Sequence, residues 1–563
     1  MLLGIDVGGT HTDAVLLDTD GLVDSAKVVT NHEDLLSSIR AALEAILKDR
    51  GSIDLERFNL STTLCTNAIV QDELVDVGVL VSAGPGIDPG FYRIGRNYAV
   101  IPGGLDHRGT EVRPLDRERA GQAVDDFLDQ GLRVFAVVNK FSPRNPSHEK
   151  QLAELLEGRS EFMTLGHSLS GQLNFPRRIA TAYYNSAVWP IFNGFANSVQ
   201  QCLEELGLSP QLNILKADGG TMPFEQARLT PVESIFSGPA ASIMGITAMC
   251  DISEDALLLD IGGTTTDVAV FADGDPLIEA ESIELDHRPT LVRAMKTKSI
   301  GLGGDSCLTV QDGQLGIGPK RLGACLAQGG PAPTLVDALN SAKCFAYGDT
   351  DASDKGMEDL GGRLGLSCEG MSWQVIQAFC RRIKEDAWEM LREINERPVY
   401  TVHEFLEYRK VAPKRIYLMG GPAEVLAPYI SREFGLPAVV PDNFAVANAL
   451  GAAVARPTHQ AELFADTEKR TMSIPVLEIF REVPASYTLD QAKEEVKGHL
   501  REHMAEKYHM TIPDEEAQII EESEMSMVKD IYAVGKDIRV KCQVKPGITP
   551  EYQRVVKCLC KEL

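Results

Sequence analysis

Short apolar runs that end in glycine turns alternate with helical patterns over the first 457 residues. Residues 2–18 read as strand, tight turn and strand, and residues 257–271 repeat that pattern. Apolar positions spaced three and four apart predict a helix over 35–47 and a long helix over 175–206, interrupted near Trp189 and Pro190. The alternation of strands and helices predicts an α/β layer architecture.

The chain changes character near Pro457. The residues beyond it are highly charged, with a helical pattern over 489–507 and strand patterns over 519–525 and 538–544. We therefore expect three units, which are an N-terminal domain (1–250), a second domain (251–457) and an appended α+β domain (458–563).

The pattern D-[IV]-G-G-T-x-T-D occurs at residues 6–13 and again at 260–267, each time between two apolar runs. Paired glycines let a hairpin turn adopt positive φ and bring backbone N–H groups close to a phosphate, and threonine hydroxyls can donate to its oxygens. Two such hairpins facing each other would hold a polyphosphate from both sides. The residues predicted to bind it are Gly8, Gly9, Thr10, Thr12, Gly262, Gly263, Thr264 and Thr266.

Four aspartates in this repeat are candidates for catalysis and metal binding. Asp6 and Asp260 each end an apolar strand, where a carboxylate is costly to bury without a cation or hydrogen-bond donors. We expect them to act as catalytic carboxylates or to bind Mg²⁺, directly or through water. Asp13 and Asp267 are expected to support the turns or to bind the metal through water. Turn capping remains the alternative role for Asp6 and Asp260, and a direct catalytic role remains the alternative for Asp13 and Asp267.

Other turns add candidates. Gly303 and Gly304 are expected to complete the phosphate or substrate site, and Asp218, which ends a strand before two glycines, is a candidate for placing the nucleophile. The sequence has no G-x-x-x-x-G-K-[ST] run, and no G-x-G-x-x-G opens a helix after the first strand. These absences disfavour P-loop and Rossmann nucleotide sites.

The charge and the cysteine content limit which binding partners and which cell compartment the sequence predicts. Lys and Arg total 55 against 81 Asp and Glu, a formal charge of −26. Such a surface repels phosphate backbones and anionic lipid, so neither a nucleic acid nor a membrane is expected as a partner. The 11 cysteines include no CxxC pair and the first residues lack a secretory signal pattern, so the chain reads as reduced and cytoplasmic. An acidic surface suits a homo-oligomer or a hetero-complex, and we expect an oligomer.

The two hairpins resemble those of the actin, sugar kinase and chaperone ATPase superfamily. Gly420 and Gly421, in LMGGPAEVLAPYI, resemble its adenosine-binding turn, and residues 238–249 and 448–455 resemble the two helices that cross at its hinge. The resemblance implies two ribonuclease H-like domains around a nucleotide cleft, followed here by the appended α+β domain. It also implies ATP and Mg²⁺ as cofactors.

Residues 1–457 resemble more specifically the hydantoinase A and 5-oxoprolinase family, which includes acetone and acetophenone carboxylase subunits. Stretches such as TTLCTNAIVQ, LKADGGTMPFEQARLTPVESIFSGPAAS and SIGLGGDSCLTV carry this resemblance. It implies ATP-dependent hydrolysis of a cyclic amide by phosphorylation of the carbonyl, a cyclic amide or ketone as substrate, and a hydantoinase B-like partner subunit. The family's usual three-glycine run is replaced here by Gly303-Gly304-Asp305-Ser306.

Other functions stay open at this point. They are an ATP-driven subunit that reactivates or remodels a partner enzyme, a carboxylase ATPase subunit and a small-molecule kinase. His499-Leu500-Arg501-Glu502-His503 matches the H-x-x-E-H zinc-protease signature, but the Lys and Glu residues around it predict a solvated charged helix instead.

Overall fold

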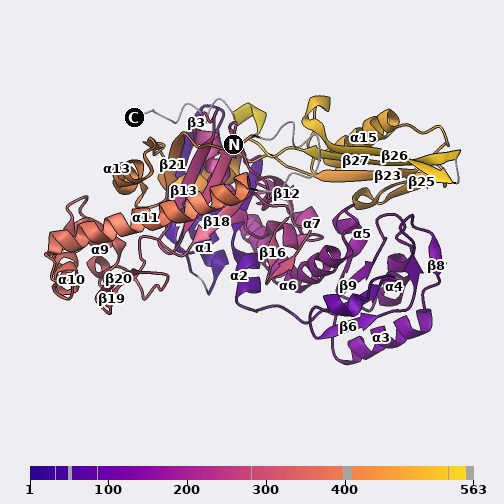
Figure 1. The fold of residues 1–563 in the computed structure, drawn as a ribbon, viewed down its shortest axis with the longest axis horizontal. Coiled ribbons are helices and arrows are strands. Elements are labelled where there is room, and N and C mark those ends of the chain that lie inside the picture. Colours follow the sequence, from indigo (N-terminus) through magenta and orange to yellow (C-terminus); the bar gives the residue numbers. More distant parts are fainter. Residues whose placement is uncertain are drawn as a thin grey trace.

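A six-stranded sheet holds the first hairpin (Figure 1). The hairpin strand β1 is fully buried and lies in the middle of this sheet, antiparallel to β2 on one side and parallel to β4 on the other. The strands in spatial order are β12 (Thr221–Pro223), β11 (Gln211–Leu215), β4 (Arg57–Thr62), β1 (Leu2–Val7), β2 (His11–Asp18) and β3 (Gly21–Val29). The computed structural model describes residues 1–31, 33–48, 53–84, 86–279, 282–396, 409–529 and 532–552.

A second sheet repeats this order around the second hairpin. β13 pairs antiparallel with β14 and parallel with β21, as β1 does with β2 and β4. The registers also agree, since Asp6 lies opposite Asp13 and Asp260 lies opposite Asp267. The strands are β15 (Asp275–Pro276), β14 (Thr266–Ala272), β13 (Ala256–Ile261), β21 (Arg415–Met419) and β22 (Ala438–Val439), with β18 (Thr297–Ile300) also paired to β14.

Two helices of small residues, α8 (Ser237–Met249) and α14 (Ala447–Val454), cross each other and share one core cluster with β1 and β13. A Cβ atom on Gly451 would lie 2.3 Å from the backbone nitrogen of Gly245, closer than real Cβ contacts. Glycine at this crossing therefore lets the two helix backbones touch, which fixes the sheets relative to each other.

Longer helices pack on the sheets and on one another. The predicted interruption near Pro190 is wrong, because α6 (Phe175–Glu205) runs through it as one helix. Its neighbours Val188 and Phe192 are fully buried, so packing holds the helix in line despite the missing N–H donor. The others are α1 (Leu35–Leu47), α9 (Leu335–Ser341), α10 (Thr350–Gly362), α11 (Cys368–Asn395) and α13 (Ala423–Phe434).

A parallel four-stranded sheet is inserted in the chain between β4 and β11. One face of this sheet packs in a core cluster of its own, with Leu80, Phe135 and Val137, while the other face, with Val79, Val81 and Ala136, belongs to the core cluster of the first sheet. The strands in spatial order are β10 (Phe162–Leu165), β9 (Val134–Asn139), β5 (Gly78–Ser82) and β6 (Asn97–Val100), with α3 (Arg117–Asp129) and α4 (Ser147–Leu156) among its helices.

The C-terminal residues form an antiparallel sheet with one long helix, which lies above α5 and β9 in Figure 1. Ion pairs join it to the inserted sheet, including Arg108 to Asp466 at 2.6 Å and Arg144 to Asp537 at 3.0 Å. The elements are β25 (Ile479–Glu482), β24 (Thr471–Ile474), β23 (Gln460–Asp466), β27 (Tyr532–Val544), β26 (Ala517–Lys529) and α15 (Leu489–Lys507). The predicted helix over 489–507 is confirmed, and the domain limits at 250 and 457 stay a prediction. Among the described helices, none has the length and apolar character needed to cross a membrane.

His167 of α5 (Gly166–Leu169) connects the inserted sheet to the C-terminal sheet. Its buried ring bonds Glu149 through Nδ1 at 2.6 Å and Glu478 through Nε2 at 2.7 Å. Burial alone lowers the pKa of His167, but the two carboxylates raise it to about 9. The folded chain therefore keeps a proton that the unfolded chain releases near pH 6.5.

We expect this contribution to stability to be complete below about pH 6.5 and to be lost as the pH rises through about 9. The difference in pKa corresponds to about 3–4 kcal/mol. Thermal unfolding of His167→Gln over this pH range should lack that decline, whereas His107→Gln, at an exposed histidine, should retain it. A wild-type pH profile in His167→Gln would contradict this role.

Candidate functional site

The two glycine turns have the same internal geometry and face each other. The Gly8 N–H donates to the His11 carbonyl at 3.1 Å, and the Gly262 N–H donates to the Thr265 carbonyl at 2.9 Å. A Cβ atom on Gly263 would lie 3.9 Å from the Thr10 hydroxyl, so the second turn approaches the first. Gly9 has nothing within 4 Å of its Cβ position, which leaves its backbone open to a ligand.

Asp6 and Asp260 end the first strand of each hairpin and come together across the helix crossing. The side chain of Asn448, on α14, lies close to both carboxylates and partly offsets the rise in their pKa. Ser242, on α8, donates to Asp260 at 2.6 Å, and Ser61, on β4, partly offsets the rise in the pKa of Asp6. Polar side chains from both crossing helices and from the parallel strand therefore surround the predicted pair.

Burial raises the pKa of Asp6 to about 7 and also raises that of Asp260, with each carboxylate opposing the charge of its neighbours. The buried Oδ1 of Asn448, next to the two carboxylates, has no hydrogen-bond partner among the described atoms. Two carboxylates and a free amide oxygen are hard oxygen ligands, so these residues fit a hydrated Mg²⁺ ion.

Asp13 and Asp267 lie beside this pair on the second strand of each hairpin. Lys27 forms an ion pair with Asp13 at 2.7 Å, and the Ser299 hydroxyl donates to Asp267. Burial raises the pKa of Asp267 to about 6, and the nearby Asp260 adds to this. The two second-strand aspartates therefore differ, since only Asp13 has a cationic partner within ion-pair distance among the described residues.

The threonines divide into two kinds. Thr12 and Thr266 are fully buried, and their hydroxyls pair with Thr30 at 3.0 Å and the Leu302 carbonyl at 2.7 Å. These two hydroxyls already form hydrogen bonds within the protein, and their binding of phosphate stays a prediction. Thr10 and Thr264 stand at the accessible turns, where a phosphate could meet them.

The Gly303–Gly304 turn braces the second hairpin. The Gly304 and Asp305 N–H groups donate to the Gly262 and Gly263 carbonyls at 2.9 and 2.7 Å. The Asp305 carboxylate lies 2.8 Å from the Cβ position of Gly263 and forms an ion pair with Arg321 at 3.0 Å. A negative charge therefore stands over the turn predicted to bind phosphate.

The Gly420–Gly421 turn lies against the end of β13, the first strand of the second hairpin. Gly420 has φ of +91°, and a Cβ atom there would lie 2.2 Å from the Ile261 carbonyl oxygen and 2.9 Å from Asp260 Oδ1. Only glycine fits this contact, whereas Gly421 has nothing within 4 Å of its Cβ position. The turn thus stands next to Asp260 with one open residue, and its role toward adenosine stays a prediction.

The structure places Asp218 away from the four hairpin aspartates. Its carboxylate lies 3.5 Å from the Lys216 ammonium and accepts the Gly220 N–H at 3.0 Å. After the opposing effect of burial, Lys216 and Arg293 lower the pKa of Asp218. It faces a cavity under the C-terminal sheet, so the structure does not group it with the hairpin aspartates.

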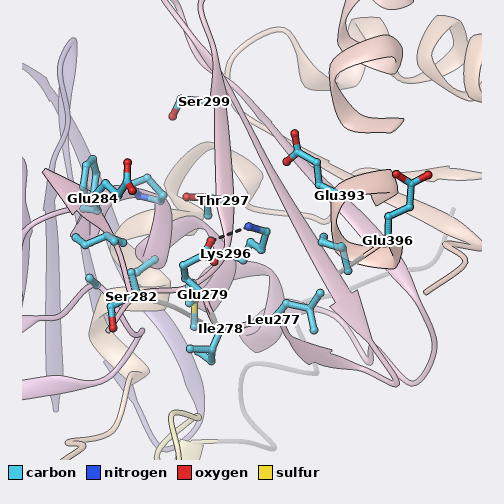
Figure 2. A pocket seen from close by; sticks show the side chains of 18 residues that line it. Leu277, Ile278, Glu279, Ser282, Glu284, Lys296, Thr297, Ser299, Glu393 and Glu396 are labelled. Carbon is cyan, nitrogen blue, oxygen red and sulfur yellow. Dashed lines mark hydrogen bonds and ion pairs between the residues drawn. The ribbon is translucent and has the colours of Figure 1, made fainter. Parts of the chain in front are cut away.

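Beside the hairpin aspartates lies a cavity of about 970 Å³ (Figure 2). Ser299, which donates to Asp267, and Ala240, two residues before Ser242, are among its lining residues. An ion pair between Lys296 and Glu279, 2.7 Å apart, stands inside it. Its apolar lining includes Leu277, Ile278, Ile283 and Met295.

The H-x-x-E-H motif lies on α15. His499 pairs with Glu502 at 3.2 Å, while the His503 ring stacks on His459. Within the described part of the chain, no three His, Cys, Asp or Glu side chains are grouped to hold a metal ion.

Two sheets of equal strand order, two facing glycine turns and two crossing helices define an actin-like ATPase fold. The predicted fold class is confirmed by the ATP-dependent caprolactamase of Pseudomonas jessenii, whose crystal structure matches with a TM-score of 0.71. That match covers 96% of this chain and 87% of the other, at 19% identity. The chain belongs to the hydantoinase/oxoprolinase family, whose model matches residues 178–461, and the model of the family's N-terminal region matches residues 2–159.

Similar curated proteins include subunits of two enzymes. Caprolactamase subunit alpha of Pseudomonas jessenii is 28% identical over 374 residues, which are 60% of this chain and 53% of that protein. The acetophenone carboxylase gamma subunit of Aromatoleum aromaticum is 27% identical over 393 residues, 60% of this chain and 52% of that protein. The matched region thus spans about half the length of each.

Proposed function

We propose that the chain is an ATP-dependent amidohydrolase that activates a cyclic amide for ring opening. The observation that carries this proposal is the cavity beside Asp260 and Asp267, on the side where Ser299 bonds Asp267. Family membership and the caprolactamase relative support a cyclic amide rather than a sugar. The names of both curated relatives as subunits support a further proposal, that a hydantoinase B-like subunit completes the enzyme.

ATP with Mg²⁺, when bound, would supply a phosphoryl group to the amide oxygen, which would make the carbonyl carbon more electrophilic toward water. The ring nitrogen would then leave as the C–N bond breaks, and a second water would release phosphate from the ring-opened acyl phosphate. The glycine turns at Gly9 and Gly263 would hold the phosphates through backbone N–H groups, and Asp6 and Asp260 would hold the metal. The Lys296–Glu279 pair presents a donor beside an acceptor, which matches the C=O and N–H of a cyclic amide. Apolar walls around this pair would accommodate the ring carbons and limit access of water.

The test measures ADP release with MgATP and a panel of cyclic amides, including hydantoin, 5-oxoproline and caprolactam. A cyclic amide should accelerate ADP release and appear as the ring-opened acid. Lys296→Gln should reduce this stimulation by roughly tenfold or more, whereas Lys298→Gln, two residues further on in β18 and paired with Glu389 at 2.5 Å, should not. Equal stimulation in both variants would contradict the assignment of the cavity.

The same assay separates the alternatives. Accumulation of a phosphorylated product would indicate a small-molecule kinase, and consumption of bicarbonate with a ketone would indicate a carboxylase subunit, as the acetophenone carboxylase relative suggests. ADP release stimulated only by a partner protein, without any small substrate, would indicate a remodelling subunit. Each outcome would replace the proposed hydrolase.

Asp305 leads to a separate prediction about the metal. Its carboxylate stands over Gly263, so free ATP should be repelled more strongly than MgATP. We expect Asp305→Asn to bind ATP in EDTA roughly fivefold to tenfold more tightly than the wild type, with a smaller change for MgATP. Calorimetric titration of both proteins with and without Mg²⁺ measures this. An unchanged affinity in EDTA would show that Asp305 does not face the phosphates.

A further inference from the structure

A second cavity, of about 830 Å³, lies between the core and the C-terminal sheet. From the core it is lined by residues of β10, the segment after β11 and the loop before β18; from the C-terminal sheet it is lined by β23, β27 and α15. In Figure 1 these elements approach each other where the C-terminal sheet meets the region of β12 and α7. Ile278, Glu279 and Ser282 line both this cavity and the first one, whereas Arg293, His459 and His503 line only this one.

Two imidazoles in the cavity wall have ring nitrogens without partners. His459 and His503 stack with their ring centroids 4.7 Å apart, and the buried Nε2 of each lacks a hydrogen bond among the described atoms. Tyr508 Oη lies 3.0 Å from His459 Nδ1, which leaves Nε2 of that ring as the atom available to a ligand. Burial lowers the pKa of both histidines, so the rings are neutral at pH 7. Buried polar atoms in this state favour a ligand that can hydrogen-bond them.

Next to the imidazoles stands a cation without a carboxylate partner. Arg293 hydrogen-bonds the amide of Gln543, and no described carboxylate lies within ion-pair distance of it. Lys216 is only 5% exposed and interacts electrostatically with both Arg293 and His459. A single carboxylate group placed among these side chains would meet one free guanidinium and the two imidazoles.

The same cavity also carries acids, which limits the charge of its ligand. Asp218 and Glu233 lie 3.5 and 3.3 Å from the Lys216 ammonium, and Glu279, Glu462 and Glu478 line other parts of the wall. Each of these acids has a cationic partner, but the buried Oε1 of Glu462 has no hydrogen bond among the described atoms, so this oxygen is open to an ammonium group. A ligand that carries one carboxylate and one ammonium group matches both kinds of side chain.

We propose that this cavity binds a small zwitterionic amino acid, with its carboxylate against Arg293, His459 and His503 and its ammonium toward the acidic wall. Because the lining comes from both the core and the C-terminal sheet, the ligand also stabilises the contact between them. The site needs no nucleotide, so its test does not depend on the proposed amidohydrolase activity.

The test is calorimetric titration of the full chain, without nucleotide, using 5-aminopentanoate as the probe. Saturable binding is expected, and 5-aminopentanamide, which keeps the ammonium but lacks the carboxylate, should bind roughly tenfold or more weakly. Arg293→Gln should weaken 5-aminopentanoate binding by a similar factor. Lys545→Gln is the matched control, because this lysine pairs with Asp275 at 2.6 Å across the same two parts of the chain, outside the cavity lining.

His459→Gln provides a second variant that keeps a hydrogen-bonding side chain and should also weaken binding. Circular dichroism of each variant shows whether it folds, and a misfolded Arg293→Gln leaves the wild-type comparison of the two probes decisive. The proposal is overturned if the wild type shows no saturable binding of 5-aminopentanoate, or binds the amide equally well. Equal affinity for pentanoate, which lacks the ammonium, would overturn the zwitterionic ligand.

Discussion

Replacing Asp6 by asparagine is expected to remove most nucleotide-dependent turnover while raising the thermal stability of the nucleotide-free chain. Burial and the charges of Asp13 and Asp260 raise the pKa of Asp6 to about 7, so the folded state becomes less favourable as the pH rises from about 4 to about 7. A shift of that size corresponds to about 3–4 kcal/mol at neutral pH. Asparagine keeps the shape and removes the charge, and this penalty disappears with it.

The same charge is what the proposed reaction needs. Loss of one preorganised electrostatic contact to a phosphoryl-transfer site lowers turnover by roughly 100-fold to 1,000-fold. Asp6→Asn should therefore show a higher melting midpoint at pH 7.5 and an ADP release rate lower by about that factor. Asp20→Asn, an exposed aspartate in the turn after β2, should change neither quantity.

Two outcomes would contradict this assignment. Wild-type turnover in Asp6→Asn would show that the carboxylate takes no part in nucleotide chemistry. A lower melting midpoint would show that Asp6 supports the fold as a turn cap, the alternative that the sequence left open. The pair of measurements thus separates a functional carboxylate from a structural one.

Replacing Gly451 by valine is expected to have the largest effect on folding. A Cβ atom at this position would lie 2.3 Å from the Gly245 nitrogen and 2.4 Å from the Ala241 carbonyl oxygen, so valine must force α8 and α14 apart. Overpacking of a rigid core costs about 1–3 kcal/mol, and more where backbone atoms cannot move aside. Because Asn448 and Ser242 are on these helices, their interactions with Asp6 and Asp260 should weaken too.

Thermal unfolding and MgATP titration of Gly451→Val measure the two effects. Gly498→Val, in α15, is the matched control, since its Cβ position has nothing within 4 Å and its helix lies outside the crossing. We expect a marked loss of stability and nucleotide affinity in the first variant and little change in the second. A Gly451→Val chain that melts with the wild type would show that the helices separate at little cost.

The strand–turn–strand repeat could be predicted because it is local in sequence. Each D-[IV]-G-G-T run lies between apolar segments, and the structure places Asp6 and Asp260 at equivalent register positions. Strands β5 and β9 were readable for the same reason, but nothing local indicated that they leave the first sheet and form one of their own. Which strands pair depends on contacts between distant segments, and local patterns do not encode these contacts.

The site was predictable at the hairpins and less so around them. Asn448 lies close to both carboxylates, although in the sequence it is only a polar residue in a helix of small apolar ones. This polar residue among small apolar ones was the one sequence feature that could indicate its place in the site, since an amide inside such a helix needs a hydrogen-bond partner. Ser242 and Ser299 gave no signal, because serine is common at exposed positions and their partners lie 18 and 32 residues away. Asp218 looked like the hairpin aspartates, yet its neighbours are contributed by other segments.

The short connection between α14 and β23 couples the hinge mechanically to the C-terminal sheet. α14 ends at Val454 and β23 begins at Gln460, and the intervening backbone is clamped on two sides. Thr549 donates to the Val454 carbonyl at 2.8 Å, and Thr221 donates to the Arg456 carbonyl at 3.0 Å. Because this connection is short and hydrogen-bonded on two sides, a rotation of α14 should carry the C-terminal sheet with it. A small rotation at the helix crossing would therefore be amplified into a larger displacement at the far strands β25 and β26.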